Sequence, residues 1–143
     1  MDLPPFKTPR IERPKVEMLD TFPAPSRNHV VRFEAPEFTC VCPKTGQPDF
    51  AQVTIWYKPL ERCIELKSLK LYLWAFREEG HFHESVAEAI KGDLVAAARP
   101  VWMVVEANFW VRGGIHTVVW AVHGDAPADL LTARQSSTTY RGY

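Results

Sequence analysis

The sequence predicts an α+β fold, in which an antiparallel four-stranded sheet carries two helices on one face. Hydrophobic patterns follow one another along the chain in the order strand, strand, helix, helix, strand, strand. The chain has 143 residues, of which 46% are hydrophobic and 24% charged, enough for one ordinary domain with a buried core. We expect this domain to span residues 29–124, between a proline-rich arm (1–28) and a polar tail (125–143).

The arm is defined by its prolines, which occupy positions 4, 5, 9, 14, 23 and 25. Each proline removes a backbone N–H that a helix or ladder would use. We therefore expect residues 1–28 to be extended, either without order or laid across a neighbouring subunit. The first residues also lack the apolar segment of a signal peptide, so a cytoplasmic protein with reduced thiols is predicted.

Two strands open the domain. Residues 29–41 (HVVRFEAPEFTCV) are rich in β-branched and aromatic residues and predict a strand interrupted near Pro36. Residues 42–50 contain two prolines and a glycine, which indicates a loop. In residues 51–59 the apolar side chains alternate with their neighbours, which predicts a strand with one buried face. The side chains expected on that face are Val53, Ile55 and Tyr57, and those between them are Gln52, Thr54 and Trp56.

The pattern then changes to spacings of three and four, as amphipathic helices require. The first helix is expected within residues 65–80 and the second within residues 81–100, ended by Gly80 and Pro100. The apolar stripes comprise Leu66, Leu69, Leu73 and Phe76 in the first helix and Val86, Ile90, Leu94 and Ala97 in the second.

Two Val- and Trp-rich strands, within residues 101–111 and 114–122, close the predicted domain around a turn at Arg112, Gly113 and Gly114. Residues 125–143 are polar and predict a loose tail. A sheet of this kind leaves open edges, which several subunits can satisfy by joining their sheets into a ring.

Charge and cysteine content exclude several classes of protein. Lys plus Arg and Asp plus Glu both total 17, so the basic excess of a duplex-binding protein is missing. No apolar run reaches the roughly 18 residues of a membrane span. Cys40 and Cys42 could join His81 and His83 in a metal site, but their spacing matches no recognised zinc motif, and no metal is expected.

Cys42 is the candidate nucleophile because it opens the loop before Pro43 and Lys44. A reactive cysteine needs partial exposure and a nearby positive charge or donor, which Lys44 and the loop backbone can supply. Asp49 ends the same loop, and a thiol beside a carboxylic acid suits addition to an electrophilic carbon. The alternative is an inert loop cysteine. Cys40 and Cys63 are expected to be small buried hydrophobes.

Other polar clusters allow a structural and a functional interpretation. Lys67, Ser68 and Lys70 make either a solvated helix face or a phosphate site at a helix start, which Arg112 beside Gly113 could extend with a forked donor. Phe82, His83 and Glu84 either cap the second helix or recognise a flat heterocycle. In the second case Phe82 stacks, Glu84 accepts hydrogen bonds and His83 serves as an acid.

Taken together, four strings resemble the NADPH-dependent 7-cyano-7-deazaguanine reductases, the QueF family of queuosine biosynthesis, in its short single-module form. They are FTCVCPKTGQPDFA, ELKSLKLYLWAF, HFHES and WVRGG, in that order within residues 37–114. The resemblance implies a tunnelling fold (T-fold), whose subunits join their sheets into a barrel with active sites at subunit interfaces. It also implies a decamer of two pentameric rings.

The implied reaction reduces the nitrile of 7-cyano-7-deazaguanine to the primary amine of 7-aminomethyl-7-deazaguanine with two NADPH. By this resemblance Cys42 forms a covalent thioimide, Asp49 donates a proton and His83 assists. The residues expected to hold the deazaguanine are Glu65, Leu66, Phe82 and Glu84, and those expected to bind NADPH are Lys67, Ser68, Lys70, Arg112 and Gly113. The substrate is a free base that has not yet joined tRNA, so no direct contact with nucleic acid is expected.

Three alternatives stay open. An archaeosine-forming amidinotransferase shares the thioimide chemistry but adds ammonia and lacks the NADPH motif. A zinc-dependent cyclohydrolase of the same fold needs a metal triad that the sequence does not offer. A non-catalytic ring-forming scaffold would carry a structural cysteine and solvated lysines.

Overall fold

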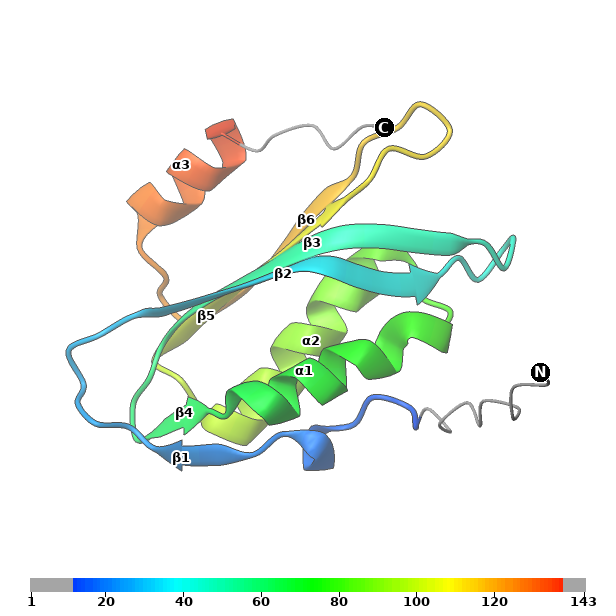
Figure 1. Ribbon diagram of the computed structural model, residues 1–143. Coiled ribbons are helices and arrows are strands. Elements are labelled where there is room, and N and C mark those ends of the chain that lie inside the picture. Colours follow the sequence, from blue (N-terminus) through cyan, green and yellow to red (C-terminus); the bar gives the residue numbers. More distant parts are fainter. Residues whose placement is uncertain (1–11, 138–143) are drawn as a thin grey trace, which may run out of the picture.

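The computed structural model describes residues 12–137, with side chains described to residue 134. Its main sheet is antiparallel in the order β2–β3–β5–β6, formed by Val31–Val41, Pro48–Lys58, Trp102–Phe109 and Val118–His123. Helices α1 (Leu66–Trp74) and α2 (His83–Ala98) cover one face of this sheet (Figure 1). The predicted α+β class and its order of strands and helices are confirmed.

Strand β2 carries the predicted irregularity at Pro36. Its pairing with β3 shifts register between Ala35 and Phe38, because a proline cannot donate to the ladder. Strand β3 starts at Pro48, earlier than the alternation predicted, since Pro48 and Asp49 pair with Val41 and Cys40. The loop between these strands therefore shrinks to six residues, 42–47.

The core lies between the sheet and the two helices. Its members include Val53, Ile55 and Tyr57 of β3, Leu69 of α1, Phe76, and Val86, Ile90 and Leu94 of α2. Leu66 was expected in this stripe but is 64% exposed, because it is the first residue of α1, at the end of the helix. Helix α1 continues as the short 3-10 helix η2 (Ala75–Glu78), which buries Phe76.

The opposite face of the sheet is also covered, which corrects two expectations. Residues 128–137 of the predicted loose tail form helix α3 (Ala128–Ser137), which lies across this face (Figure 1). Leu130 and Leu131 pack beside a cluster of Trp56, Trp102 and Val104. Strand β3 is therefore buried on both faces rather than one, because apolar side chains of the tail cover the tryptophans.

An ion pair fixes α3 in place. Arg134 Nη2 lies 2.5 Å from Glu106 Oε1, and Trp120 Nε1 donates to Glu106 Oε2 at 2.9 Å. Glu106 is only 1% exposed, so its carboxylate depends on these donors. Residues 138–143 of the expected tail lie outside the described residues.

The described part of the N-terminal arm lies against its own chain. Residues 16–18 form a 3-10 helix, η1 (Val16–Met18), and strand β1 (Thr21–Pro23) pairs with β4 (Arg62–Ile64). Leu19 enters the core between them. The arm thus contains a short 3-10 helix and a paired strand, although its prolines were expected to prevent any regular helix or ladder. The ladder tolerates Pro23 because this residue stands at the end of β1. Residues 1–11 of the expected arm lie outside the described residues.

The β5–β6 turn is wider than expected. Strand β6 begins at Val118, and within the connection Arg112 and Ile115 form an isolated bridge that places Arg112 beyond the end of β5. Over residues 12–137, none of the helices has the length and apolar character to cross a membrane.

Candidate active site

Cys42 stands at the start of a tight loop that follows β2. The loop is closed by two backbone bonds, from Cys42 N–H to the Gln47 carbonyl (2.8 Å) and from Gly46 N–H to the Cys42 carbonyl (2.9 Å). Gly46 adopts a φ of 72°, the left-handed region that glycine tolerates best. This turn holds the Cys42 side chain partly exposed at the end of the sheet.

The environment of Cys42 favours a thiolate. Its pKa is lowered by a hydrogen bond from the Thr45 hydroxyl, then by the backbone N–H groups of Thr45 and Lys44, and also by the charge of Arg112, while desolvation opposes the shift. The loop backbone supplies donors as predicted. Lys44, however, acts through its N–H, and the cation near the sulfur is Arg112, 70 residues along the chain, a pairing invisible to local sequence patterns.

The other two cysteines are buried, as expected. Cys40 pairs with Asp49 across strands β2 and β3. Desolvation, with the Asp49 charge next, raises the pKa of Cys40 to about 12, so Cys40 stays a protonated thiol near neutral pH. Of the two neighbours Cys40 and Cys42, only Cys42 combines exposure with a stabilised anion.

Asp49 is the buried acid of this site. It is 6% exposed, and its carboxylate accepts a hydrogen bond from Arg112 Nη1. His83 Nε2 lies 3.4 Å from Asp49 Oδ2, while the imidazole ring stacks on Phe109 with centroids 3.7 Å apart and planes 4° apart. Arg112 and His83 thus hold the carboxylate from two sides.

The start of α2 is fastened to the end of β2, which brings His83 to the loop. Val41 N–H donates to the Glu79 carbonyl at 2.9 Å, and His81 N–H donates to the Val41 carbonyl at 3.0 Å. This short parallel bridge is a long-range pairing between two segments whose hydrophobic patterns are unrelated.

A cavity of about 300 Å³ collects most of the predicted catalytic and substrate-binding side chains. Cys42, Asp49, His83, Phe82, Glu84 and Arg112 line it, together with Pro43, Thr45 and His81. Phe82, 55% exposed, offers a flat apolar surface, and Glu84 offers an acceptor. The cavity therefore combines a nucleophile, an acid and groups suited to a flat polar heterocycle.

Glu65 and Ser68, by contrast, are engaged in the structure of α1. Glu65 caps this helix, accepting from Lys67 N–H at 2.8 Å and Ser68 N–H at 2.7 Å, and these bonds, that from Ser68 first, lower the pKa of its carboxyl group. The Ser68 hydroxyl donates to the Glu65 carbonyl and accepts from Asp20 N–H. The predicted phosphate site at this helix start thus already holds the Glu65 carboxylate.

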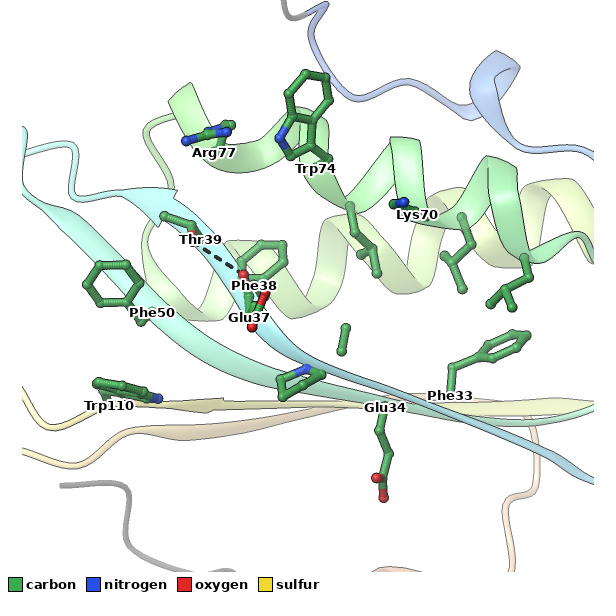
Figure 2. Close-up of a pocket in the computed structure, with 15 residues that line it drawn as sticks. Phe33, Glu34, Glu37, Phe38, Thr39, Phe50, Lys70, Trp74, Arg77 and Trp110 are labelled. Carbon is green, nitrogen blue, oxygen red and sulfur yellow. Dashed lines mark hydrogen bonds between the residues drawn. The ribbon is translucent and has the colours of Figure 1, made fainter. Parts of the chain in front are cut away.

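A separate groove of about 760 Å³ runs between α1 and β2 (Figure 2). Leu66 and Lys70 line it with Trp74, Arg77 and Trp110, three residues that no local sequence pattern singled out. Arg77 lies over the Trp74 ring at 5.8 Å. Flat aromatic rings and cations are the groups that a phosphate-bearing dinucleotide such as NADPH requires, so the groove fits that ligand chemically.

The predicted cofactor residues are therefore divided within one chain. Lys70 faces the groove, whereas Arg112 faces the Cys42 cavity. Gly113 follows Arg112 in the β5–β6 turn. Its φ is 58°, and the space that a Cβ atom would occupy is open. Across residues 12–137, no three His, Cys, Asp or Glu side chains gather in a way that could hold a metal ion.

A family model described as QueF-like protein matches residues 48–128, more than half of the chain. The chain belongs to the QueF family. The "NADPH-dependent 7-cyano-7-deazaguanine reductase" of Anaeromyxobacter dehalogenans (strain 2CP-C) is 62% identical over 114 residues, covering 78% of this QueF-family chain and 93% of the relative. The enzyme of the same name from Thiobacillus denitrificans is 58% identical over 131 residues, covering 87% and 94%. The predicted membership is confirmed.

The crystal structure of an archaeosine synthase QueF-Like in the apo form matches with a TM-score of 0.64 and 23% identity, over 68% of this chain and 96% of that one. At this identity the match establishes the fold alone. The tunnelling fold expected for the QueF family is thereby confirmed.

Proposed function

We propose that this QueF-family chain catalyses the NADPH-dependent reduction of 7-cyano-7-deazaguanine to 7-aminomethyl-7-deazaguanine, a step of queuosine biosynthesis. Relatives 56–62% identical carry the name of that reductase. The observation that carries the proposal is the Cys42 sulfur, stabilised as an anion in a cavity that also contains the buried Asp49 carboxyl group.

The first step follows from the chemistry of this cavity. The Cys42 thiolate attacks the nitrile carbon, a C–S bond forms, and the nitrile nitrogen takes a proton, which gives a covalent thioimide. His83, 3.4 Å from Asp49, passes a proton from solvent to the Asp49 carboxylate, and Asp49 delivers that proton to the nitrogen. Phe82 stacks on the deazaguanine and Glu84 accepts its N–H groups.

NADPH supplies a hydride twice, because a nitrile needs four electrons to become an amine. The first hydride ends on the thioimide carbon, and rupture of the C–S bond releases the Cys42 thiolate and an imine. The same donors that stabilised the nucleophile now stabilise this leaving group. Phe82 and Glu84 retain the imine until the second hydride arrives.

The test is to mix the protein with 7-cyano-7-deazaguanine and record the intact mass and the ultraviolet spectrum. Without NADPH, we expect a mass increase equal to the whole substrate, because attack on a nitrile expels no leaving group. With NADPH, we expect two equivalents oxidised per nitrile consumed. Absence of the adduct, or turnover with ammonia in place of NADPH, would contradict the reductase and in the second case favour the amidinotransferase.

We further infer that the active unit is a homo-oligomer, a decamer of two pentamers, with each site shared by two copies. Leu66 and Lys70 line a groove that is separate from the Cys42 cavity of their own chain. At that groove the chain exposes Phe50, Trp74 and Trp110. In the described sheet, β2 and β6 are the edge strands, and a second copy can pair with each of them.

Mixing an inactive variant with an impaired one tests this sharing. Lys67→Ala removes a cation predicted to hold NADPH, for an expected loss of about 10-fold or more in kcat/KM for NADPH. Co-expressed Cys42→Ala and Lys67→Ala chains should regain about one quarter of wild-type activity, since random pairing places an intact Cys42 opposite an intact Lys67 at that frequency. Activity no higher than that of the Lys67→Ala protein alone would place both residues in one chain.

We also expect the reaction in the cytoplasm, where NADPH and reduced thiols are maintained, and without direct contact with nucleic acid. The balance of 17 basic and 17 acidic residues supports the second point. Cell fractionation that finds the protein outside the cytoplasm would contradict the first expectation. A gel shift of tRNA by the protein at physiological salt would contradict the second.

A further inference from the structure

Thr45 is a hydrogen-bond partner of the cation in the Cys42 cavity. Arg112 Nη2 donates to the Thr45 hydroxyl oxygen at 2.6 Å, and Gln47 N–H donates to the same oxygen at 3.3 Å. Thr45 lines the same cavity as Cys42, three residues away in the same tight loop, and a hydrogen bond from its hydroxyl is the largest cause that lowers the pKa of the Cys42 thiol. One oxygen therefore has three polar neighbours, and their chemistry fixes the direction of each bond.

A hydroxyl group has one proton and two acceptor lone pairs. A guanidinium and a backbone N–H can only donate, so the Thr45 oxygen accepts from both and its lone pairs are taken. Its proton is left for the sulfur. The hydroxyl group is thus oriented to donate its proton toward Cys42. A hydrogen bond to an anionic thiolate is stronger than one to a neutral thiol, so this orientation favours the thiolate.

The same guanidinium also holds the acid. Arg112 Nη1 donates to Asp49 Oδ1, while Nη2 reaches Thr45 and, at 2.5 Å, the Gln47 side-chain oxygen. The planar fork of Arg112 therefore relates the position of the proton donor to that of the nucleophile. Its positive charge polarises the Thr45 hydroxyl and strengthens the bond that the hydroxyl donates.

We propose that Thr45 is a positioning residue of the active site: its hydroxyl, oriented by Arg112, donates to the Cys42 sulfur and holds it toward the cavity as a nucleophile. The consequence for nitrile reduction rests on the function proposed above. When the thioimide forms, the sulfur loses its charge and this hydrogen bond weakens. When the C–S bond breaks, the thiolate returns and the bond strengthens, so Thr45 assists departure as well as attack.

The test compares Thr45→Val, which keeps the branched shape without the hydroxyl, with Thr45→Ser, which keeps the hydroxyl. Iodoacetamide labelling of Cys42 is followed against pH by peptide mass, and needs neither nitrile nor NADPH. In Thr45→Val the midpoint of labelling should rise by about one pH unit, as the loss of a hydrogen bond to a charged group implies. In Thr45→Ser it should stay near the wild-type value.

Thr21→Val, on strand β1 outside the Cys42 cavity, is the matched control and should leave the midpoint unchanged. If Thr45→Val fails to fold by its thermal transition, Thr45→Ala makes the same deletion in an exposed loop position. An unchanged midpoint in the folded deletion variant would overturn the proposal.

A second readout separates this inference from the proposed function. In Thr45→Val the rate of adduct formation with 7-cyano-7-deazaguanine should fall about 10-fold while KM for NADPH stays constant. A shifted midpoint in a protein that forms no adduct would support Thr45 and contradict the reductase. Adduct formation with an unshifted midpoint would support the reductase and overturn the role of Thr45.

Discussion

Replacing Cys42 by alanine is expected to abolish both the covalent adduct and NADPH oxidation, with residual turnover at least 10⁴-fold below the wild-type value. Alanine cannot form the C–S bond, and a free nitrile is a poor hydride acceptor. No nearby thiol can replace it, because Cys40 is buried and its pKa is raised by desolvation to about 12. Intact mass after incubation with 7-cyano-7-deazaguanine, and NADPH absorbance with time, measure the two losses.

Cys40→Ala is the matched control for this variant. It removes a thiol two residues earlier, on strand β2, and this thiol faces the core. We expect its adduct to persist at some cost in stability, about 1 kcal/mol for a small buried side chain. An adduct in Cys42→Ala, or its loss in a folded Cys40→Ala, would show that the nucleophile has been misassigned.

The rate of adduct formation in the wild-type protein should increase with pH. The pKa of Cys42 is lowered, chiefly by the Thr45 hydroxyl, so the thiolate persists at pH values where an ordinary cysteine is protonated. The thiolate fraction should therefore rise with pH and level off below the ordinary cysteine pKa.

Asp49→Asn is the second variant with a large expected effect, a fall in kcat of about 10²- to 10⁴-fold. Asparagine keeps the shape of the side chain but has no carboxyl proton to give to the nitrile nitrogen. It also leaves Arg112 without the carboxylate that one arm of its fork contacts. Single-turnover adduct formation and steady-state NADPH oxidation should both slow, with a smaller change in KM for NADPH.

Asp93→Asn provides the comparison for Asp49. Asp93 accepts a hydrogen bond from the Tyr72 hydroxyl at 2.6 Å within the helix pair and lies outside the Cys42 cavity. We expect it to lower the free energy of unfolding by about 1 kcal/mol and to leave kcat unchanged. Equal losses of kcat in the two variants would mean that the Asp49 effect is one of folding.

Local hydrophobic patterns predicted much of the fold because each pattern depends only on the residues of one strand or helix. The alternation of Val53, Ile55 and Tyr57 placed those side chains in the core, and the helical spacing of Val86, Ile90 and Leu94 did the same for α2. The tail was mispredicted because α3 gains its stability from tryptophans on strands far away in the sequence. A short helix of this kind is stabilised by the surface it covers more than by its own residues.

The candidate site also has features that local sequence predicts and features that depend on long-range contacts. By itself, the sequence determined which chemistry is present: a loop that presents Cys42, an acid seven residues later, and the order of strands and helices. Only the tertiary structure decided that Arg112 crosses 67 residues to orient Thr45 and that His83 reaches Asp49. The reason is physical, because a hydrogen bond depends on distance and direction in space, and separation along the chain sets neither until the sheet and helices pack.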